Sequence, residues 1–249
     1  MNKVYQLAWL IFFTFVYYLL HLFNVVNPLL LPPLKEIVIS LVKDFISGNL
    51  LIIIFNTLTM MFKGILLATL LALLLNYLYQ FKVFKSLDEL LLKLMHPLPS
   101  IALLPIVITF IGLNEIAIIV IIIHSVIWPL LLNLISARAE INPLHLKLAK
   151  NYEFNRIQTY FEIIIPASFS FLFAGIKIGF ARAFRAVISA EMIFGAVSGE
   201  GGLGYYLFSK RIFMDSSGMF AGLVVIIILG MIIEFILEII QRRYINVRD

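Results

Sequence analysis

The sequence predicts an all-α integral membrane protein with about six transmembrane helices, an outer interfacial helix and a cytoplasmic helix-turn-helix. Composition is the first reason: 62% of the 249 residues are hydrophobic and 13% are charged, whereas soluble domains are about half apolar and a quarter charged. The second reason is that apolar runs long enough to cross a bilayer recur along the whole chain. We therefore expect a single transmembrane domain covering residues 1–249.

Six apolar runs are the candidate spans, each read against the roughly 20 residues that a bilayer crossing needs. The first run is not followed by a small-residue cleavage site, so we expect it to be retained rather than removed as a signal peptide. The third is short and flanked by prolines. The expected spans are residues 5–26, 57–79, 98–113, 115–136, 167–190 and 219–240.

The basic residues indicate how the protein is oriented in the membrane. With the N-terminus inside, most Lys and Arg residues near span ends fall in inner segments, and the outer segments carry only Lys35, Lys43, Lys210 and Arg211. By the positive-inside rule, both termini of this multi-pass inner (plasma) membrane protein face the cytoplasm, with membrane lipid around the spans. No basic, aromatic-rich patch exists of the kind that binds nucleic acid, so we expect no nucleic-acid partner.

Two helices outside the spans are also predicted. Pro32-Pro33 opens an amphipathic segment that stops at Gly48 and should lie along the outer interface. On the inner side, Ser86 and Glu89 have the spacing of a capping box, which predicts a helix that ends before Pro97.

Residues 138–166 are too polar to span and have the pattern of a helix, a turn and a helix. Asn142 followed by proline is a strong helix start, with Asn as the cap and Pro in the first helical position. Asn155 with Gln158 three residues later is a second start. The break is expected near Glu153-Phe154.

This segment resembles the coupling loop of binding-protein-dependent ABC transporter permeases, the inner-membrane components of ABC importers. The pattern of that loop is Glu-Ala-Ala, three residues, Gly, nine residues, Ile, one residue and Leu-Pro. With Pro166 fixing the register, most of the second half agrees, and Leu is replaced conservatively by Ile. The matching positions are Ala149, Ile163 and Pro166, and Ile165 is the conservative replacement.

Three positions of the loop depart from the family pattern. Lys147 stands for Glu, Leu148 for the first Ala, and Glu153 for Gly. The Gly would supply a left-handed turn conformation, and we expect Asn151 or Asn155 to substitute for it, since Asn tolerates that conformation better than most residues.

Other segments, in order along the chain, carry the same resemblance from about residue 31 to residue 243. They are Leu31-Pro32-Pro33, Asn56-Thr57-Leu58, the proline-rich stretch at 97–105, Phe110-Ile111-Gly112, Ala190-Glu191-Met192 and residues 201–205. The last two look most like the branch that imports nitrate, sulfonates, taurine and thiamine precursors.

The resemblance implies a set of partners. In that family the loop docks on a cytoplasmic ATP-binding subunit, two permease copies pair, here as an expected homodimer, and an extracytoplasmic substrate-binding protein delivers the solute. The chain has no Gly-x-x-x-x-Gly-Lys-Ser/Thr phosphate loop, so ATP hydrolysis is expected on the partner and this chain is not expected to be an enzyme. With no cysteine and no metal-ligand spacing among four histidines, we expect no metal and no cofactor.

Four ionisable residues around the fifth span are candidates for the substrate pathway: Lys177, Arg182, Arg185 and Glu191. Charges inside a membrane are costly enough to suggest function. Arg182 and Arg185 share a helix face, and they either snorkel to the outer surface or face a cavity, where they would suit an anionic substrate.

Two other classes of protein stay open beside the permease. An ion-coupled secondary transporter would be expected to show midplane charges and an internal duplication, and neither is evident. A membrane-embedded enzyme would be expected to show clustered acid, base or metal-ligand residues at a membrane face, and we find no such cluster.

Overall fold

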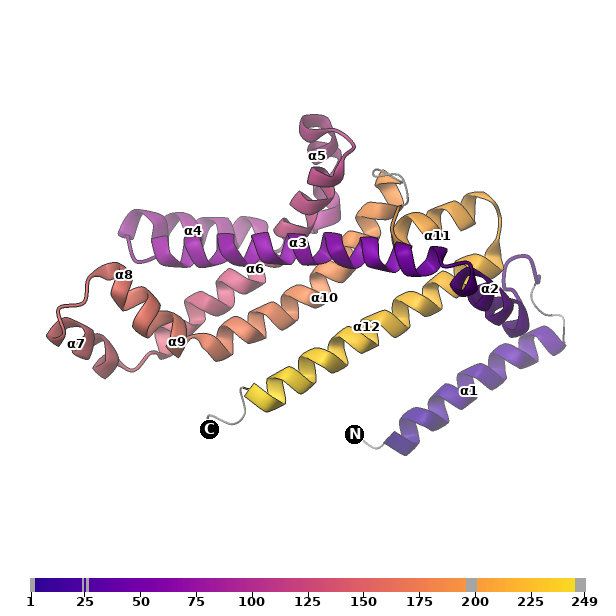
Figure 1. Ribbon diagram of the computed structural model, residues 1–249, viewed down its shortest axis with the longest axis horizontal. Helices are drawn as coiled ribbons and strands as arrows, with labels where there is room; N and C mark the ends of the chain where they lie inside the picture. The colour runs from indigo at the N-terminus through magenta and orange to yellow at the C-terminus, as the bar shows by residue number, and fades with distance from the viewer. Residues whose placement is uncertain (1–2, 24, 26, 196–200, 245–249) are drawn as a thin grey trace.

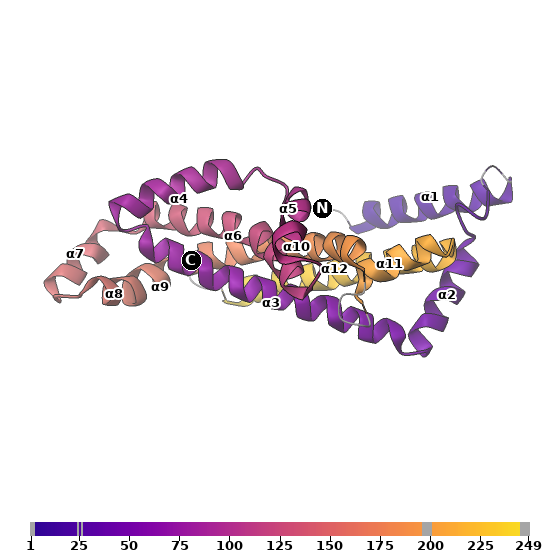
Figure 2. The same cartoon turned by 90° about the horizontal axis from the view of Figure 1, so that it is seen from above.

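The computed structural model describes residues 3–23, 25, 27–195 and 201–244, which form an elongated helical bundle (Figures 1 and 2). Its long helices are α1 (Lys3–Leu22), α3 (Asn49–Leu78), α6 (Glu115–Glu140), α10 (Phe169–Phe194) and α12 (Ser216–Tyr244). The short helices α7 (Pro143–Asn151), α8 (Arg156–Thr159) and α9 (Ile165–Ala167) lie at one end of the bundle, and α2 (Leu34–Ile46) and α11 (Leu203–Ile212) lie at the other.

Helix α6 occupies the centre of the core, between α3 and α10. Small residues allow the close approach of α10: a Cβ on Gly175 would lie 2.7 Å from Leu130 Cδ1, and one on Gly179 would lie 2.9 Å from Val126 Cγ1. These glycines are four residues apart on one face of α10, a spacing that lets two membrane helices pack backbone to side chain.

Three helices of the described residues are long and apolar enough to cross a membrane, namely α3, α6 and α12. Two further spans are added if each of two sharply bent pairs of helices is counted as one span. Helix α4 (Lys82–Met95) meets the short 3₁₀ helix η1 (Ser100–Leu103) and α5 (Leu104–Ile111) at 95°, and the 156–167 helices meet α10 at 69°. The structure therefore supports an all-helical membrane protein with three to five candidate spans.

The expected third span, residues 98–113, is not a straight helix. Pro97 and Pro99 precede η1, and α5 covers only eight residues, or about 12 Å of the roughly 30 Å hydrocarbon core. Proline disfavours a helical residue before it, which separates α4 from α5. In Figure 1, α5 projects away from the long helices.

The two predicted helices outside the spans are both present. Helix α2 follows Pro33 and ends just before Gly48, whose φ of 78° is left-handed; it packs against α3 and α12, and its place at the interface stays a prediction. Helix α4 starts at Lys82, so the capping box expected at Ser86 was wrong: Ser86 is inside the helix, and Glu89 instead accepts a hydrogen bond from the Tyr79 hydroxyl at 3.2 Å.

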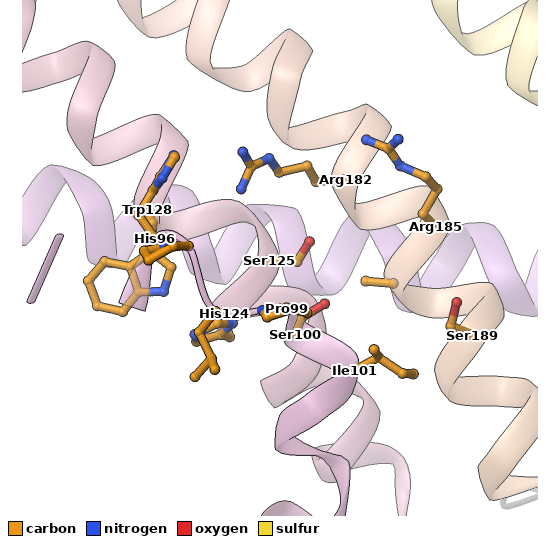
Figure 3. A pocket seen from close by; sticks show the side chains of 13 residues that line it. His96, Pro99, Ser100, Ile101, His124, Ser125, Trp128, Arg182, Arg185 and Ser189 are labelled. Atoms are coloured by element: carbon orange, nitrogen blue, oxygen red, sulfur yellow. The ribbon is translucent and has the colours of Figure 1, made fainter. Parts of the chain in front are cut away.

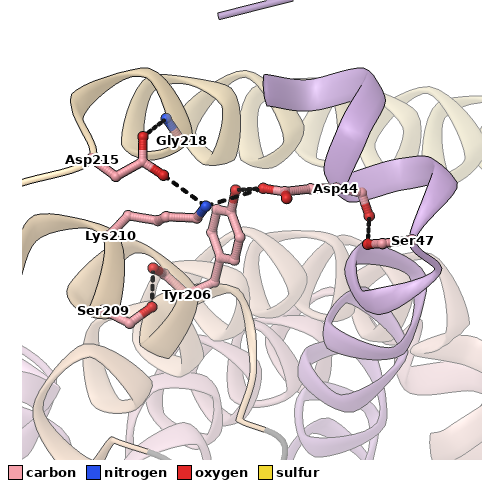
Figure 4. A network of polar contacts seen from close by, with 7 residues as sticks. All are labelled: Asp44, Ser47, Tyr206, Ser209, Lys210, Asp215 and Gly218. Atoms are coloured by element: carbon pink, nitrogen blue, oxygen red, sulfur yellow. Dashed lines mark hydrogen bonds and ion pairs between the residues drawn. The ribbon is translucent and has the colours of Figure 1, made fainter. Parts of the chain in front are cut away.

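A polar network holds together the end of the bundle that carries α2 and α11 (Figure 4). The Tyr206 hydroxyl of α11 donates to Asp44 of α2. The Lys210 ammonium lies 3.3 Å from the Asp44 carboxylate and 2.8 Å from that of Asp215, which also accepts the Gly218 N–H at the start of α12. Three helices that meet at this end are therefore fixed by one lysine and two carboxylates.

Candidate functional site

The helix-turn-helix segment, residues 138–166, has the start signals that the sequence predicts. The Asn142 side chain accepts the Leu144 N–H at 2.9 Å, and Pro143 is the first residue of α7. Asn155 and Gln158 form a complete capping box at α8, with both reciprocal hydrogen bonds at 2.9 Å. Both signals act within four residues, which is why local sequence is sufficient to specify them.

Glu153 itself adopts the left-handed conformation where the family pattern has Gly, with φ of 55°. The Phe154 N–H donates to the Ala149 carbonyl at 2.9 Å, and the Glu153 N–H donates to the Lys150 carbonyl at 3.0 Å. This pair of bonds is the Schellman motif that closes a helix C-terminus. The expectation that Asn151 or Asn155 replaces the Gly was wrong, since Asn151 ends α7 and Asn155 is extended as a cap.

The segment is anchored to α3 by a buried tyrosine. The Tyr160 hydroxyl donates to the Leu73 carbonyl at 2.7 Å, and its ring meets Tyr77 edge-on with centroids 5.1 Å apart. Ile141 and Ile164 complete this small buried cluster. Burial raises the pKa of Tyr160 to about 12 against the opposing effect of a nearby arginine, so the hydroxyl keeps the proton that it donates.

Arg138, at the end of α6, strengthens the same attachment. Its guanidinium donates to the backbone carbonyl and to the side-chain oxygen of Asn76 on α3. It also lies over the rings of Tyr79 and Tyr160, at 5.8 and 5.7 Å from their centroids, distances at which a cation is attracted to an aromatic face. The segment is thus joined to α3 and α6, and through α9 to α10.

The outward surface of the segment carries large apolar side chains among its polar and charged ones. Leu148 is 41% exposed and Tyr152 is 73% exposed. A hollow of about 320 Å³ lies beside them, lined by His145, Leu148, Glu162, Ile163, Pro166 and Ala167. Large exposed apolar side chains beside a hollow are typical of interaction sites. The other exposed large apolar residues here are Leu144, Leu146, Phe154, Ile157 and Phe161.

The residues of the family pattern divide between surface and interior. Lys147 and Glu153 are exposed, Leu148, Ile163 and Pro166 line the hollow, Ala149 is 3% exposed, and Ile165 packs against the Tyr160 cluster.

A second feature is a cavity of about 560 Å³, hereafter the basic cavity (Figure 3). Arg182, Arg185 and Ser189 reach it from α10, and His124, Ser125 and Trp128 reach it from α6. The turn between α4 and α5 supplies the remaining wall, residues 96–101. No acidic side chain is among the described residues that line it.

Comparison with known proteins decides the family. Residues 64–246 match the profile of the binding-protein-dependent transport system inner membrane component. The chain belongs to this family. It is 26% identical over 223 residues to a Methanocaldococcus jannaschii protein whose name assigns it as an ABC transporter permease, covering 88% of this chain and 82% of that one.

Two further relatives have names that specify a transported solute. The taurine transport system permease protein TauC of Escherichia coli is 24% identical over 153 residues, 61% of this chain and 54% of its own length. The nitrate import permease protein NrtB of Synechocystis is 23% identical over 152 residues, with the same shares of the two chains. The alternatives of a secondary transporter and a membrane enzyme lose their support.

The permease does not bring all four candidate pathway residues together. Arg182 and Arg185 line the basic cavity. Lys177 lies in a different groove, between α10 and α12, where its ammonium is 3.1 Å from Gln241 Oε1. Glu191 is buried away from the cavity, and the Thr57 hydroxyl and the Gly204 N–H both donate to its carboxylate, at 3.0 and 2.9 Å.

Thr57 completes a latch that holds the start of α11. Its hydroxyl oxygen accepts a hydrogen bond from the Leu203 N–H at 2.8 Å, and the same hydroxyl donates a hydrogen bond to Glu191. The carboxylate packs so closely on Gly202 that a Cβ there would lie 2.1 Å from Glu191 Oε1. We call Thr57, Glu191 and residues 202–204 the α11 latch.

His96, His124 and Trp128 are the cavity residues that sequence reasoning missed. His96 and His124 are far apart in sequence and show no ligand spacing, so the sequence did not mark either as a site residue. The one signal available was local: His124 and Trp128 are four residues apart and share a face of α6. The fold, not the spacing, brings them to the arginines of α10.

Proposed function

We propose that this chain is the permease subunit of an ABC importer, acting as one of two copies that together pass a small anionic or organic solute. A separate cytoplasmic ATP-binding subunit would power it, and an extracytoplasmic binding protein would deliver the solute. Family membership supports this arrangement.

The observation that carries the proposal is the helix-turn-helix segment. It exposes several large apolar side chains among its polar ones, while its inner side is attached to α3 by Tyr160 and Arg138. Such a surface gains free energy when a partner covers it, at about 25 cal/mol per Å² of apolar area. A rigid attachment also lets that partner move the long helices. We assign the segment as the ATPase-docking element.

The solute class rests on Arg182 and Arg185 in the basic cavity and on two relatives named for taurine and nitrate. Guanidinium groups recognise anionic oxygens through paired hydrogen bonds. A small anion is therefore the solute that these side chains suit.

Docking can be tested with Leu148→Glu, because Leu148 lines the hollow and is partly exposed, so the change leaves the interior intact. We expect normal membrane insertion but loss of co-purification with the ATP-binding subunit. Phe213→Glu is the control, since Phe213 is 80% exposed and directly follows α11, which lies at the opposite end of the bundle (Figure 1). Undiminished co-purification of the Leu148 variant would remove the docking assignment.

Orientation can be tested by labelling, because the sequence contains no cysteine. The positive-inside distribution predicts that a single cysteine at Tyr152 is protected from a membrane-impermeant maleimide in intact cells, and that one at Phe213 is labelled. The reverse pattern would contradict cytoplasmic termini.

A further inference from the structure

The basic cavity contains hydrogen-bond donors for which the described chain supplies no acceptor. His124 and Trp128 are one turn apart on α6, with ring centroids 5.9 Å apart. Both ring nitrogens of His124 and the indole nitrogen of Trp128 are buried and have no hydrogen-bond partner among the described residues. An indole N–H can only donate, and a buried unpaired donor is unfavourable. An acceptor placed in the cavity would remove that penalty.

The charged side chains of the cavity also favour an acceptor, and in particular an anionic one. None of the ion pairs formed within the described ranges includes Arg182 or Arg185, and the Arg185 Nε–H donates only to the Ala181 carbonyl of its own helix. Figure 3 shows the Arg182 side chain extending from α10 toward the side of the cavity where His96 and Trp128 lie. With no carboxylate among the described residues that line the cavity, the Arg182 guanidinium favours an anion there and disfavours a cation.

The rest of the wall limits what else the ligand carries. Pro97, Leu98, Pro99 and Ile101 contribute mainly apolar surface. A cavity of about 560 Å³ has room for a short organic chain beyond an oxoanion head. A ligand ammonium group would find no carboxylate among the described lining residues, so it would be desolvated without compensation.

We propose that His124 and Trp128 of α6, together with Arg182 of α10, form a subsite for the oxoanion head of the solute. The lack of a carboxylate among the described lining residues then selects solutes whose remainder is apolar, such as short alkanesulfonates, over zwitterions such as taurine. This subsite rests on the proposed function only in that the solute's route passes through the cavity.

Binding can be measured on the purified full-length permease in lipid nanodiscs. The chain has two tryptophans, and Trp9 on α1 is exposed, so Trp9→Phe leaves Trp128 as the only tryptophan. Ethanesulfonate should change its emission saturably. Taurine should bind at least about tenfold more weakly, because its ammonium adds an unpaired charge. Equal affinity for taurine would overturn the selection of apolar anions.

Variants then test the three named residues by titration calorimetry. Trp128→Phe keeps a ring but removes the N–H, and His124→Leu keeps most of the volume but removes both nitrogens. Each should weaken ethanesulfonate binding about tenfold, the size of effect expected for a hydrogen bond to a charged group. Arg182→Gln should weaken it further. Lys177→Gln, a cation of the same helix outside the cavity, should bind as the parent does.

Unchanged binding by Trp128→Phe and His124→Leu, or an equal loss for Lys177→Gln, would overturn the subsite. Co-purification of each variant with the ATP-binding subunit reports correct folding. If co-purification with the ATP-binding subunit is retained but the parent shows no saturable ethanesulfonate binding, the subsite is refuted and the permease assignment stands. If the parent binds ethanesulfonate saturably but never co-purifies with the ATP-binding subunit, the permease assignment is refuted and the subsite stands.

Discussion

Replacing Glu153 with glycine should stabilise the turn of the helix-turn-helix segment. Glu153 is held at φ of 55°, a conformation that costs a residue with a Cβ about 1–2 kcal/mol. Its side chain is exposed, so its removal sacrifices no packing. Glycine avoids the strain but adds freedom to the unfolded chain, at a cost of about 0.5–1 kcal/mol. The net gain is about 0.5–1 kcal/mol.

Hydrogen exchange of the Phe154 amide measures this gain locally. That amide donates to the Ala149 carbonyl at 2.9 Å, the bond that closes the motif. If the turn opens less often by about 0.5–1 kcal/mol, exchange of this amide should slow about two- to fivefold. The measurement is best made on the permease bound to its ATP-binding subunit and again on the free permease.

Two control variants separate backbone strain from side-chain effects. Glu153→Ala keeps the Cβ and should give no gain. Met214, at φ of 53°, closes α11 in the same way, with the Asp215 N–H donating to the Lys210 carbonyl at 2.9 Å. Met214→Gly should therefore slow exchange at Asp215 by a similar factor. Equal exchange at Phe154 in the glycine and alanine variants at Glu153 would refute strain as the source.

Three further changes test other parts of the permease. Tyr160→Phe removes one hydrogen bond to the α3 backbone and should lower stability by about 1 kcal/mol, seen as a lower melting temperature. Gly202→Ala would place its Cβ 2.1 Å from Glu191 Oε1 and should cost about 1–3 kcal/mol, with faster proteolysis near α11. Burial alone would raise the pKa of Asp215, but hydrogen bonds and Lys210 hold it below its usual value of 3.8. Ionised Asp215 therefore contributes fully to stability above its usual pKa, and this contribution is lost as pH falls through the lower folded-state pKa. Melting temperatures measured over a series of acid pH values would detect the loss.

Each of these changes has a matched control. Tyr152→Phe alters a 73% exposed tyrosine and should leave the melting temperature unchanged. A Cβ on Gly230 would lie 3.4 Å from Phe184 Cε1, an ordinary contact, so Gly230→Ala should not open the α11 latch. Asp215→Asn should remove the part of the fall in melting temperature at acid pH that is due to this carboxylate. Equal effects of a variant and its control would contradict the corresponding contact.

The parts of the fold that could be predicted from sequence are those whose determinants are local. The caps at Asn142 and Asn155 need only a side chain and an amide two or three residues away, and both were predicted correctly. The start of α4 was wrong because the spacing of Ser86 and Glu89 also occurs inside a helix, where no free N–H needs a cap. The π-helical turn at Tyr160–Ile164 had no recognised sequence signal.

The basic cavity could be predicted only in part, because its residues converge through tertiary packing. Arg182 and Arg185 were found since a charge in an apolar span is conspicuous. His124 and Trp128 were not, because each is unremarkable until α6 is placed against α10. The partners of Glu191 were equally hidden: Thr57 is 134 positions away in the chain.

One helix connects the helix-turn-helix segment with the α11 latch. Leu73 of α3 accepts the Tyr160 hydroxyl, and Thr57 of the same helix donates to Glu191. The two contacts are sixteen positions apart along an unbroken helix, a distance of about 24 Å at 1.5 Å per residue. Glu191 belongs to α10, which begins directly after the segment that carries Tyr160. Because α3 and α10 are joined at both ends, a displacement of the helix-turn-helix segment acts on both helices together and reaches the start of α11 unless the Thr57–Glu191 bond opens.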